Sequence, residues 1–142
     1  MIEVINRQRQ RKINSESWRH FTGQALKAIG STGRNVTIVF VSDAAIKKLN
    51  RQFRGKNQTT DVLSFAVKAE PFETDHEPSL GEVVISLQRA AEQARENQVT
   101  FQSEVKQLIL HGLLHLSGYD HESDDGEMDR LELRLRKRLG IS

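Results

Sequence analysis

The chain has 142 residues, of which 37% are hydrophobic and 28% charged, proportions that fit one soluble domain spanning residues 1–142 and exclude a disordered or fibrous protein. The chain has no apolar run of roughly 18 residues and no N-terminal secretory signal, so we expect a cytoplasmic protein with no membrane partner. It has no cysteine, which excludes disulfides and thiolate metal ligands. The net charge of +2 is uneven, since residues 1–56 carry +9 and residues 57–142 carry −7; a positive face could attract a polyanion such as nucleic acid, unless the two halves mix in the fold.

The first third of the chain predicts a helix between two strands. Residues 2–5 alternate apolar and polar side chains, which indicates a strand. A helix capped by Ser15 follows, because apolar residues then recur at helical spacing until Gly30 ends the pattern. Residues 35–42 are rich in β-branched side chains and predict the clearest strand of the chain.

The middle of the chain predicts a short helix, two loops and a third strand. Asp43 is expected to cap a helix that runs to about residue 53. A polar loop over residues 54–60 leads to a strand over residues 61–67. Residues 69–79 contain both prolines of the chain and are mostly polar, so we expect a solvated loop there.

The last part of the chain predicts one strand and three helices. Residues 80–87 form the strand, and Ser86 caps the helix that follows it. Thr100 caps a buried helix, which Gly118 should end in a left-handed turn. The last helix is expected from about residue 123 to residue 139. This order of elements indicates an α+β fold, in which a small mixed four-stranded sheet packs with about five helices.

Three of the five histidines fall within eleven residues, as His111-Gly-Leu-Leu-His115-Leu-Ser-Gly-Tyr-Asp-His121. Residues four apart on a helix share a face, so His111 and His115 can present their imidazoles to one ion. Gly118 can adopt a positive φ and turn the chain so that His121 becomes the third ligand. Three imidazole nitrogens suit one zinc ion and leave a fourth position for a water molecule, whose pKa zinc lowers. The alternative is a set of histidines that only satisfy hydrogen bonds in the core.

The same spacing occurs in metzincin proteases, but their catalytic base is missing. Those enzymes carry glutamate directly after the first histidine, where this chain has Gly112. Met128 is the only methionine apart from Met1, and it falls inside a predicted helix, so a Met-turn is not supported either. Peptide hydrolysis by the usual zinc protease route is therefore not expected.

A phosphodiester bond in RNA is a more suitable substrate than a peptide bond for a metal site without that base. RNA carries its own nucleophile, the 2′-hydroxyl, and a metal ion and a cationic side chain can stabilise the charge of the transition state. Arg54, on the loop Arg54-Gly55-Lys56, is the best cationic candidate. The residue pattern alone equally allows an ordinary surface arginine.

With these motifs, the chain resembles the YbeY family of bacterial rRNA maturation factors. The histidine motif of residues 111–121 is the most specific part of the resemblance. Residues 49–50, 54–56, 60–65 and 80–86 reinforce it, and the order of elements fits the family over the whole chain.

The resemblance implies a zinc-dependent endoribonuclease specific for single strands. It would act in ribosomal RNA processing, notably at the 3′ end of the small-subunit RNA, and in ribosome quality control. Its partners would be single-stranded ribosomal RNA, with small-subunit ribosomal proteins or an assembly GTPase as further candidates. By position, His111, His115 and His121 would bind one Zn²⁺ ion, and Arg54 and His115 would be catalytic.

Several further residues leave alternatives open. Asp120 could orient a ligand imidazole or act as a base, but it could equally be a solvated turn residue. Asp61 and Ser64 could reach the metal site from their strand, but Asp61 could also be an acidic residue that ends the preceding loop. Four residues differ from those common in the family: Asn57, Thr59, Ala66 and Glu82. None of them is an expected metal ligand, so these differences bear more on substrate preference than on metal binding.

Two other functions remain possible at the level of sequence. The protein could be a zinc-stabilised assembly factor that binds ribosomal RNA or ribosomal proteins without cutting. It could also be a zinc peptidase, which would need a catalytic base from elsewhere in the chain.

Overall fold

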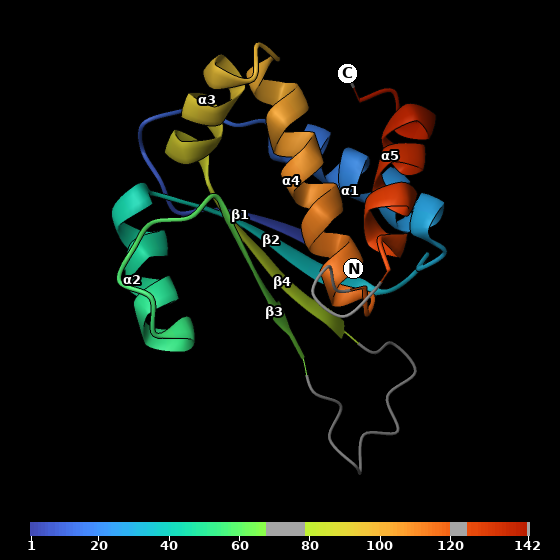
Figure 1. Ribbon diagram of the computed structural model, residues 1–142, viewed down its shortest axis with the longest axis horizontal. Helices are drawn as coiled ribbons and strands as arrows, with labels where there is room; N and C mark the ends of the chain where they lie inside the picture. Colours follow the sequence, from blue (N-terminus) through green and yellow to red (C-terminus); the bar gives the residue numbers. More distant parts are fainter. Residues whose placement is uncertain (68–78, 120–124, 142) are drawn as a thin grey trace.

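The computed structural model describes residues 1–67, 79–119 and 125–141 (Figure 1). The described residues form a four-stranded sheet and five helices, which confirms the predicted α+β fold. The elements are β1 (Ile2–Asn6), α1 (Ser15–Ile29), β2 (Asn35–Val41), α2 (Asp43–Arg54), β3 (Val62–Ala66), β4 (Ser79–Ser86), α3 (Leu87–Glu96), α4 (Phe101–Leu116) and α5 (Glu127–Leu139). None of the helices seen here has the length and apolar character needed to cross a bilayer.

The sheet is mixed, with strand order β1-β2-β4-β3. Strands β1, β2 and β4 run parallel, whereas β3 pairs antiparallel with β4 and places Phe65 opposite Glu82. Strands β1 and β3 are therefore the two edges of the sheet.

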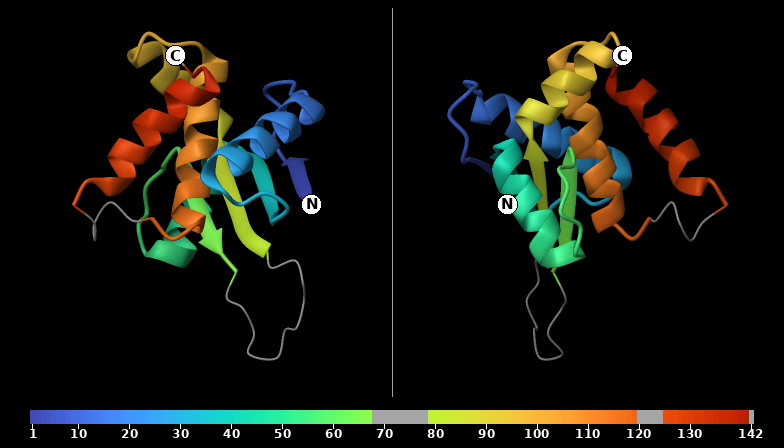
Figure 2. Two further views of the ribbon diagram at one scale, coloured as in Figure 1. Left: turned by 90° about the vertical axis from the view of Figure 1, so that its right-hand side faces the viewer. Right: turned by 60° about the vertical axis from the view of Figure 1, so that its left-hand side comes forward.

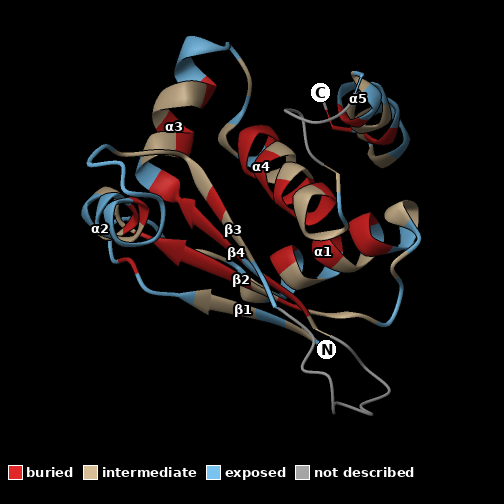
Figure 3. Cartoon of the chain, turned by 60° about the horizontal axis from the view of Figure 1, so that its bottom comes forward, coloured by how far each residue is buried: buried red, intermediate tan, exposed pale blue. Residues whose placement is uncertain are grey.

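The two faces of the sheet are covered unequally. On one face, side chains of β2 and β4 such as Ile38 and Val83 join the main core with α1, α3, α4 and α5. Figure 3 shows this concentration of buried residues on the central strands and on α4. On the other face, alternate residues such as Val39 and Val84 form a smaller cluster with Ile46 of α2. The helix α4 thus lies on one face of the sheet and α2 on the other.

Two predicted helix caps are wrong by one residue. Asn14, and not Ser15, caps α1, and Ser42, and not Asp43, caps α2, because each accepts the backbone N–H three residues further on. Ser15 and Asp43 are the first residues of their helices instead. In both cases two adjacent residues are good caps, and the backbone conformation decides between them.

The other helix ends are closer to expectation. Ser86 and Thr100 cap α3 and α4 as predicted. Gly118 has the predicted positive φ, 102°, two residues after α4 ends. The last helix begins at Glu127, after a cap at Gly126, so the predicted start near residue 123 was too early.

Candidate metal and RNA site

The helix α4 carries two of the three predicted ligands on one side. Thr100 caps the helix by accepting the N–H of Ser103 at 3.0 Å. Leu110, Leu113 and Leu114 are fully buried and fix the helix against the core. His111 and His115 are only partly buried and lie one turn apart near the C-terminal end of α4.

The imidazoles of His111 and His115 face each other. Their Nε2 atoms are 3.1 Å apart, and the ring centroids are 4.6 Å apart with planes at 79°. Two nitrogens bound to one tetrahedral zinc ion at about 2.0–2.1 Å lie about 3.3 Å from each other. The donor pair therefore fits a zinc ion without a change in the backbone.

The third predicted ligand, His121, lies outside the described residues, as does Asp120. Within residues 1–67, 79–119 and 125–141, no group of three potential ligands comes together. His111 and His115 are thus the part of the predicted site whose geometry is described.

Glu132 of α5 holds the outer nitrogen of His111. The Nδ1–H of His111 donates to Oε1 of Glu132 over 2.9 Å, and both side chains are partly buried, with 28% and 19% of their surface exposed. A hydrogen bond from Nδ1–H leaves the lone pair on Nε2, which is the tautomer that binds a metal ion. No local pattern in the sequence points to Glu132, because it lies 21 residues from His111 on another helix.

Negatively charged side chains act on His111. The hydrogen bond to Glu132 raises the pKa of His111 above its ordinary value, and the negative charges of Glu132, Asp61 and Asp129 add to this effect, while burial acts against it. The same charges that favour an imidazolium ion favour a metal cation in its place. Asp61, which directly precedes β3, thus influences His111 through its charge.

A buried carboxyl group, Glu104, lies two turns before His111 on α4. It is only 5% exposed. Burial raises the pKa of Glu104, and the charge of Asp61 raises it further, whereas Arg136 lowers it. Glu104 thus retains its proton to higher pH than an exposed glutamate does.

Gly112 faces the sheet and not the histidine pair. A Cβ atom on this residue would lie 2.6 Å from Cγ1 of Val83 and 3.1 Å from Oγ of Ser64. The hydroxyl of Ser64 also reaches the carbonyl oxygen of Gly112 at 3.5 Å. The close approach of α4 to β3 and β4 therefore requires glycine, and a glutamate at this position would have no room.

Arg54 lies at the end of α2, which Gly55 terminates with a φ of 69°. The side chain is exposed. In Figures 1 and 2, the C-terminal ends of α2 and α4 both lie at the end of the molecule where β3 ends. Because α2 and α4 cover opposite faces of the sheet and both contact the edge strand β3, Arg54 and the histidine pair belong to helices on opposite sides of β3.

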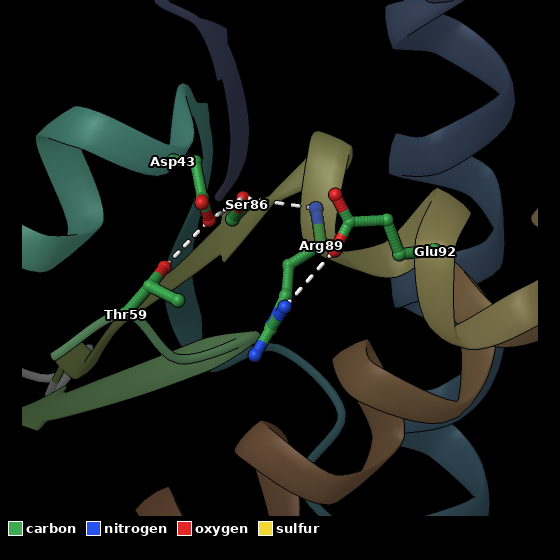
Figure 4. A network of polar contacts seen from close by, with 5 residues as sticks. All are labelled: Asp43, Thr59, Ser86, Arg89 and Glu92. Carbon is green, nitrogen blue, oxygen red and sulfur yellow. Dashed lines mark hydrogen bonds and ion pairs between the residues drawn. The ribbon is translucent and has the colours of Figure 1, made fainter.

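The loop after Arg54 is anchored by a polar network (Figure 4). The carboxylate of Asp43 accepts the hydroxyl of Thr59 at 2.5 Å and that of Ser86 at 3.2 Å. Asn50 donates to the carbonyl of Gln58 at 2.9 Å. These contacts tie residues 58 and 59 to α2 and β4, so the predicted polar loop has a defined path. They also show the role of the Asp43 carboxylate, which binds the loop and does not cap α2.

Comparison with known proteins relates this arrangement to one family. A family model described as "Endoribonuclease YbeY" matches residues 3–140. A protein of that name from Geobacter metallireducens is 36% identical over 141 residues, covering 99% of this chain and 94% of its own length. Another from Nautilia profundicola is 43% identical over 110 residues, which are 78% of this chain and 76% of that protein. A solution structure of a Thermotoga maritima protein has a TM-score of 0.66 at 29% identity, covering 98% of this chain and 89% of the other.

Proposed function

The chain belongs to the endoribonuclease YbeY family, and from this premise we propose that it cleaves single-stranded RNA with one bound zinc ion. The RNA is ribosomal, the reaction contributes to maturation of the small-subunit RNA at its 3′ end and to ribosome quality control, and the protein works in the cytoplasm. The observation that carries the proposal is the pair of facing Nε2 atoms of His111 and His115, 3.1 Å apart.

The zinc ion would be held by His111, His115 and His121. The Nε2 atoms of the first two, 3.1 Å apart, lie close to the separation of about 3.3 Å between two ligands of a tetrahedral zinc ion, which supports this assignment. When bound, zinc supplies Lewis-acid chemistry that polarises a phosphoryl oxygen and acidifies a water molecule. The contribution of Glu132 is to orient His111 and to keep the lone pair on Nε2.

Arg54 would contact the RNA strand and stabilise negative charge at the phosphate. An arginine suits this task because its guanidinium group stays charged and binds phosphate oxygens in pairs. The exposed position of Arg54 at the end of α2 supports this role. Gly112 supports a phosphodiester substrate indirectly, because the position of the protease base faces the sheet and has no room for a side chain.

Removal and return of the metal tests the function. The purified protein should cleave a single-stranded RNA, lose that activity after chelation and dialysis, and recover it when one equivalent of zinc is added. A duplex of the same sequence should be cut far more slowly. Circular dichroism of the metal-free protein is the control for folding. If chelation unfolds the protein and no preparation shows metal-dependent cleavage, the protein is a zinc-stabilised assembly factor and not a nuclease.

Replacing Glu132 by glutamine should weaken zinc binding by about 10- to 100-fold, the usual cost of losing an outer partner of a metal-bound histidine. The amide can still accept from His111, but it lacks the negative charge that favours the cation. Competition with a chromogenic chelator measures the zinc dissociation constant. Glu127→Gln, an exposed substitution in the first turn of the same helix, is the matched control. Wild-type affinity in Glu132→Gln would show that the carboxylate does not act on the metal.

A further inference from the structure

The face of the sheet that carries α2 has a groove of about 350 Å³ beside that helix. Apolar side chains from α2 and from all four strands line it, together with one positive and one negative residue. The side chains that matter here are Leu49, Phe53, Phe65, Val84, Arg7 and Glu82. The groove lies on the opposite face of the sheet from the histidine pair.

Phe53 is unusually exposed for an aromatic side chain. Its exposed fraction is 65%, and its ring meets that of Phe65 edge to face, with centroids 5.2 Å apart and planes at 69°. Phe65 itself packs against the buried cluster of this face. The contact with Phe65 therefore holds the Phe53 ring in place while most of its surface stays accessible to a ligand.

The helix that carries Phe53 is strongly basic. Between residues 42 and 60 the chain has a single acidic residue, Asp43, which is bound to Thr59 and Ser86. Five exposed basic residues come from α2 and the loop after it: Lys47, Lys48, Arg51, Arg54 and Lys56. Three of them, Lys47, Lys48 and Arg51, line a second hollow of about 360 Å³ on α2.

An accessible aromatic ring within a cationic surface is the combination that binds single-stranded nucleic acid. Phosphates follow the positive charge, and bases stack on the rings regardless of their sequence. Phe53 directly precedes Arg54, the arginine proposed to bind phosphate. Neither an acidic peptide nor a second copy of this chain would need an accessible aromatic ring at that position. The charge of this surface and the aromatic pair together favour an RNA strand.

We propose that Phe53 and Phe65 form a stacking platform for one base of the RNA strand, next to the phosphate held by Arg54. The proposal rests on the proposed function and adds a base-binding subsite to it. On β3, Ser64 contacts α4 at Gly112, whereas the next residue, Phe65, faces α2. A strand that reaches both the platform and the histidine pair must therefore pass the β3 edge of the sheet.

The test compares a strand with bases to a strand without them. Fluorescence anisotropy gives the dissociation constants of a labelled single-stranded 2′-O-methyl oligouridylate and of an abasic strand of equal length. Phe53→Ala should bind the oligouridylate about tenfold more weakly, because one stacked base is lost, and should bind the abasic strand like wild type. Phe53→Trp should restore the affinity. Leu133→Ala, which truncates a side chain of 55% exposure on α5, is the matched control and should change neither constant.

The salt dependence separates stacking from charge. Phe53→Ala should keep the wild-type slope of log affinity against log salt, whereas Arg54→Gln should reduce it by about 0.7, the value for one phosphate contact on a single strand. Unchanged binding of oligouridylate by Phe53→Ala, or an equal loss for the abasic strand, overturns the platform. Cleavage by wild type with no effect of Phe53→Ala refutes the platform and leaves the proposed function intact. Base-dependent binding without any cleavage refutes the function and leaves the platform intact.

Discussion

Replacing His115 by alanine should abolish stoichiometric zinc binding and reduce RNA cleavage by more than about 100-fold. Loss of a residue that only hydrogen-bonds a metal ligand already lowers metal affinity or activity by up to about 100-fold. Loss of His115, which would be a ligand itself, should therefore have a larger effect. The remaining Nε2 of His111 would lose the nitrogen that faces it at 3.1 Å. Zinc content after dialysis and the rate of single-strand cleavage are the measurements.

The control for this substitution is His20→Ala. His20 is an exposed histidine of α1, so its loss tests whether any histidine removal lowers zinc content. The side chain of His115 is only partly buried, and its truncation should leave the melting temperature of the metal-free protein nearly unchanged. One equivalent of tightly bound zinc in His115→Ala would exclude His115 as a ligand.

Replacing Arg54 by glutamate should leave zinc binding intact and reduce cleavage by about 10²- to 10³-fold, the range found when one group that stabilises transition-state charge is removed. The side chain is exposed at the end of α2, so the fold does not depend on it. A negative charge there would also repel the RNA strand. Zinc content and cleavage rate, measured on the same preparation, separate this effect from a loss of metal.

A suitable control for Arg54→Glu is Arg138→Glu. Arg138 is an exposed basic residue in the last turn of α5, so this change also places a negative charge at a helix C-terminus, where it is unfavourable by about 0.3–1 kcal/mol. Arg138→Glu should cleave like wild type. Normal cleavage by Arg54→Glu would mean that Arg54 is an ordinary surface residue.

Local patterns in the sequence predicted the elements well but not the ends of every helix. The periodicity of apolar residues predicts α4, and its consequence, that His111 and His115 share one side, is seen in the facing rings. The caps of α1 and α2 were assigned one residue late, because Asn14 and Ser15, or Ser42 and Asp43, are equally good caps by type. The carboxylate of Asp43 instead accepts hydrogen bonds from Thr59 and Ser86, which are distant in sequence and so cannot be predicted from a local pattern.

Contacts between distant segments could not be predicted from local patterns. The bond from His111 to Glu132 joins α4 to α5, and the pair of Phe53 and Phe65 joins α2 to β3. The sequence shows only that Gly112 cannot supply a catalytic base. Its close packing against Val83 and Ser64 gives it a structural role as well. Each of these depends on the way the helices pack on the sheet, which the order of elements alone leaves open.

The most direct test of the account is the cleavage of one single-stranded RNA by wild type, His115→Ala and Arg54→Glu, purified side by side. Rapid cleavage is expected from wild type alone, with zinc bound to wild type and to Arg54→Glu but not to His115→Ala. Equal cleavage by all three proteins would contradict it and would trace the activity to a contaminating nuclease.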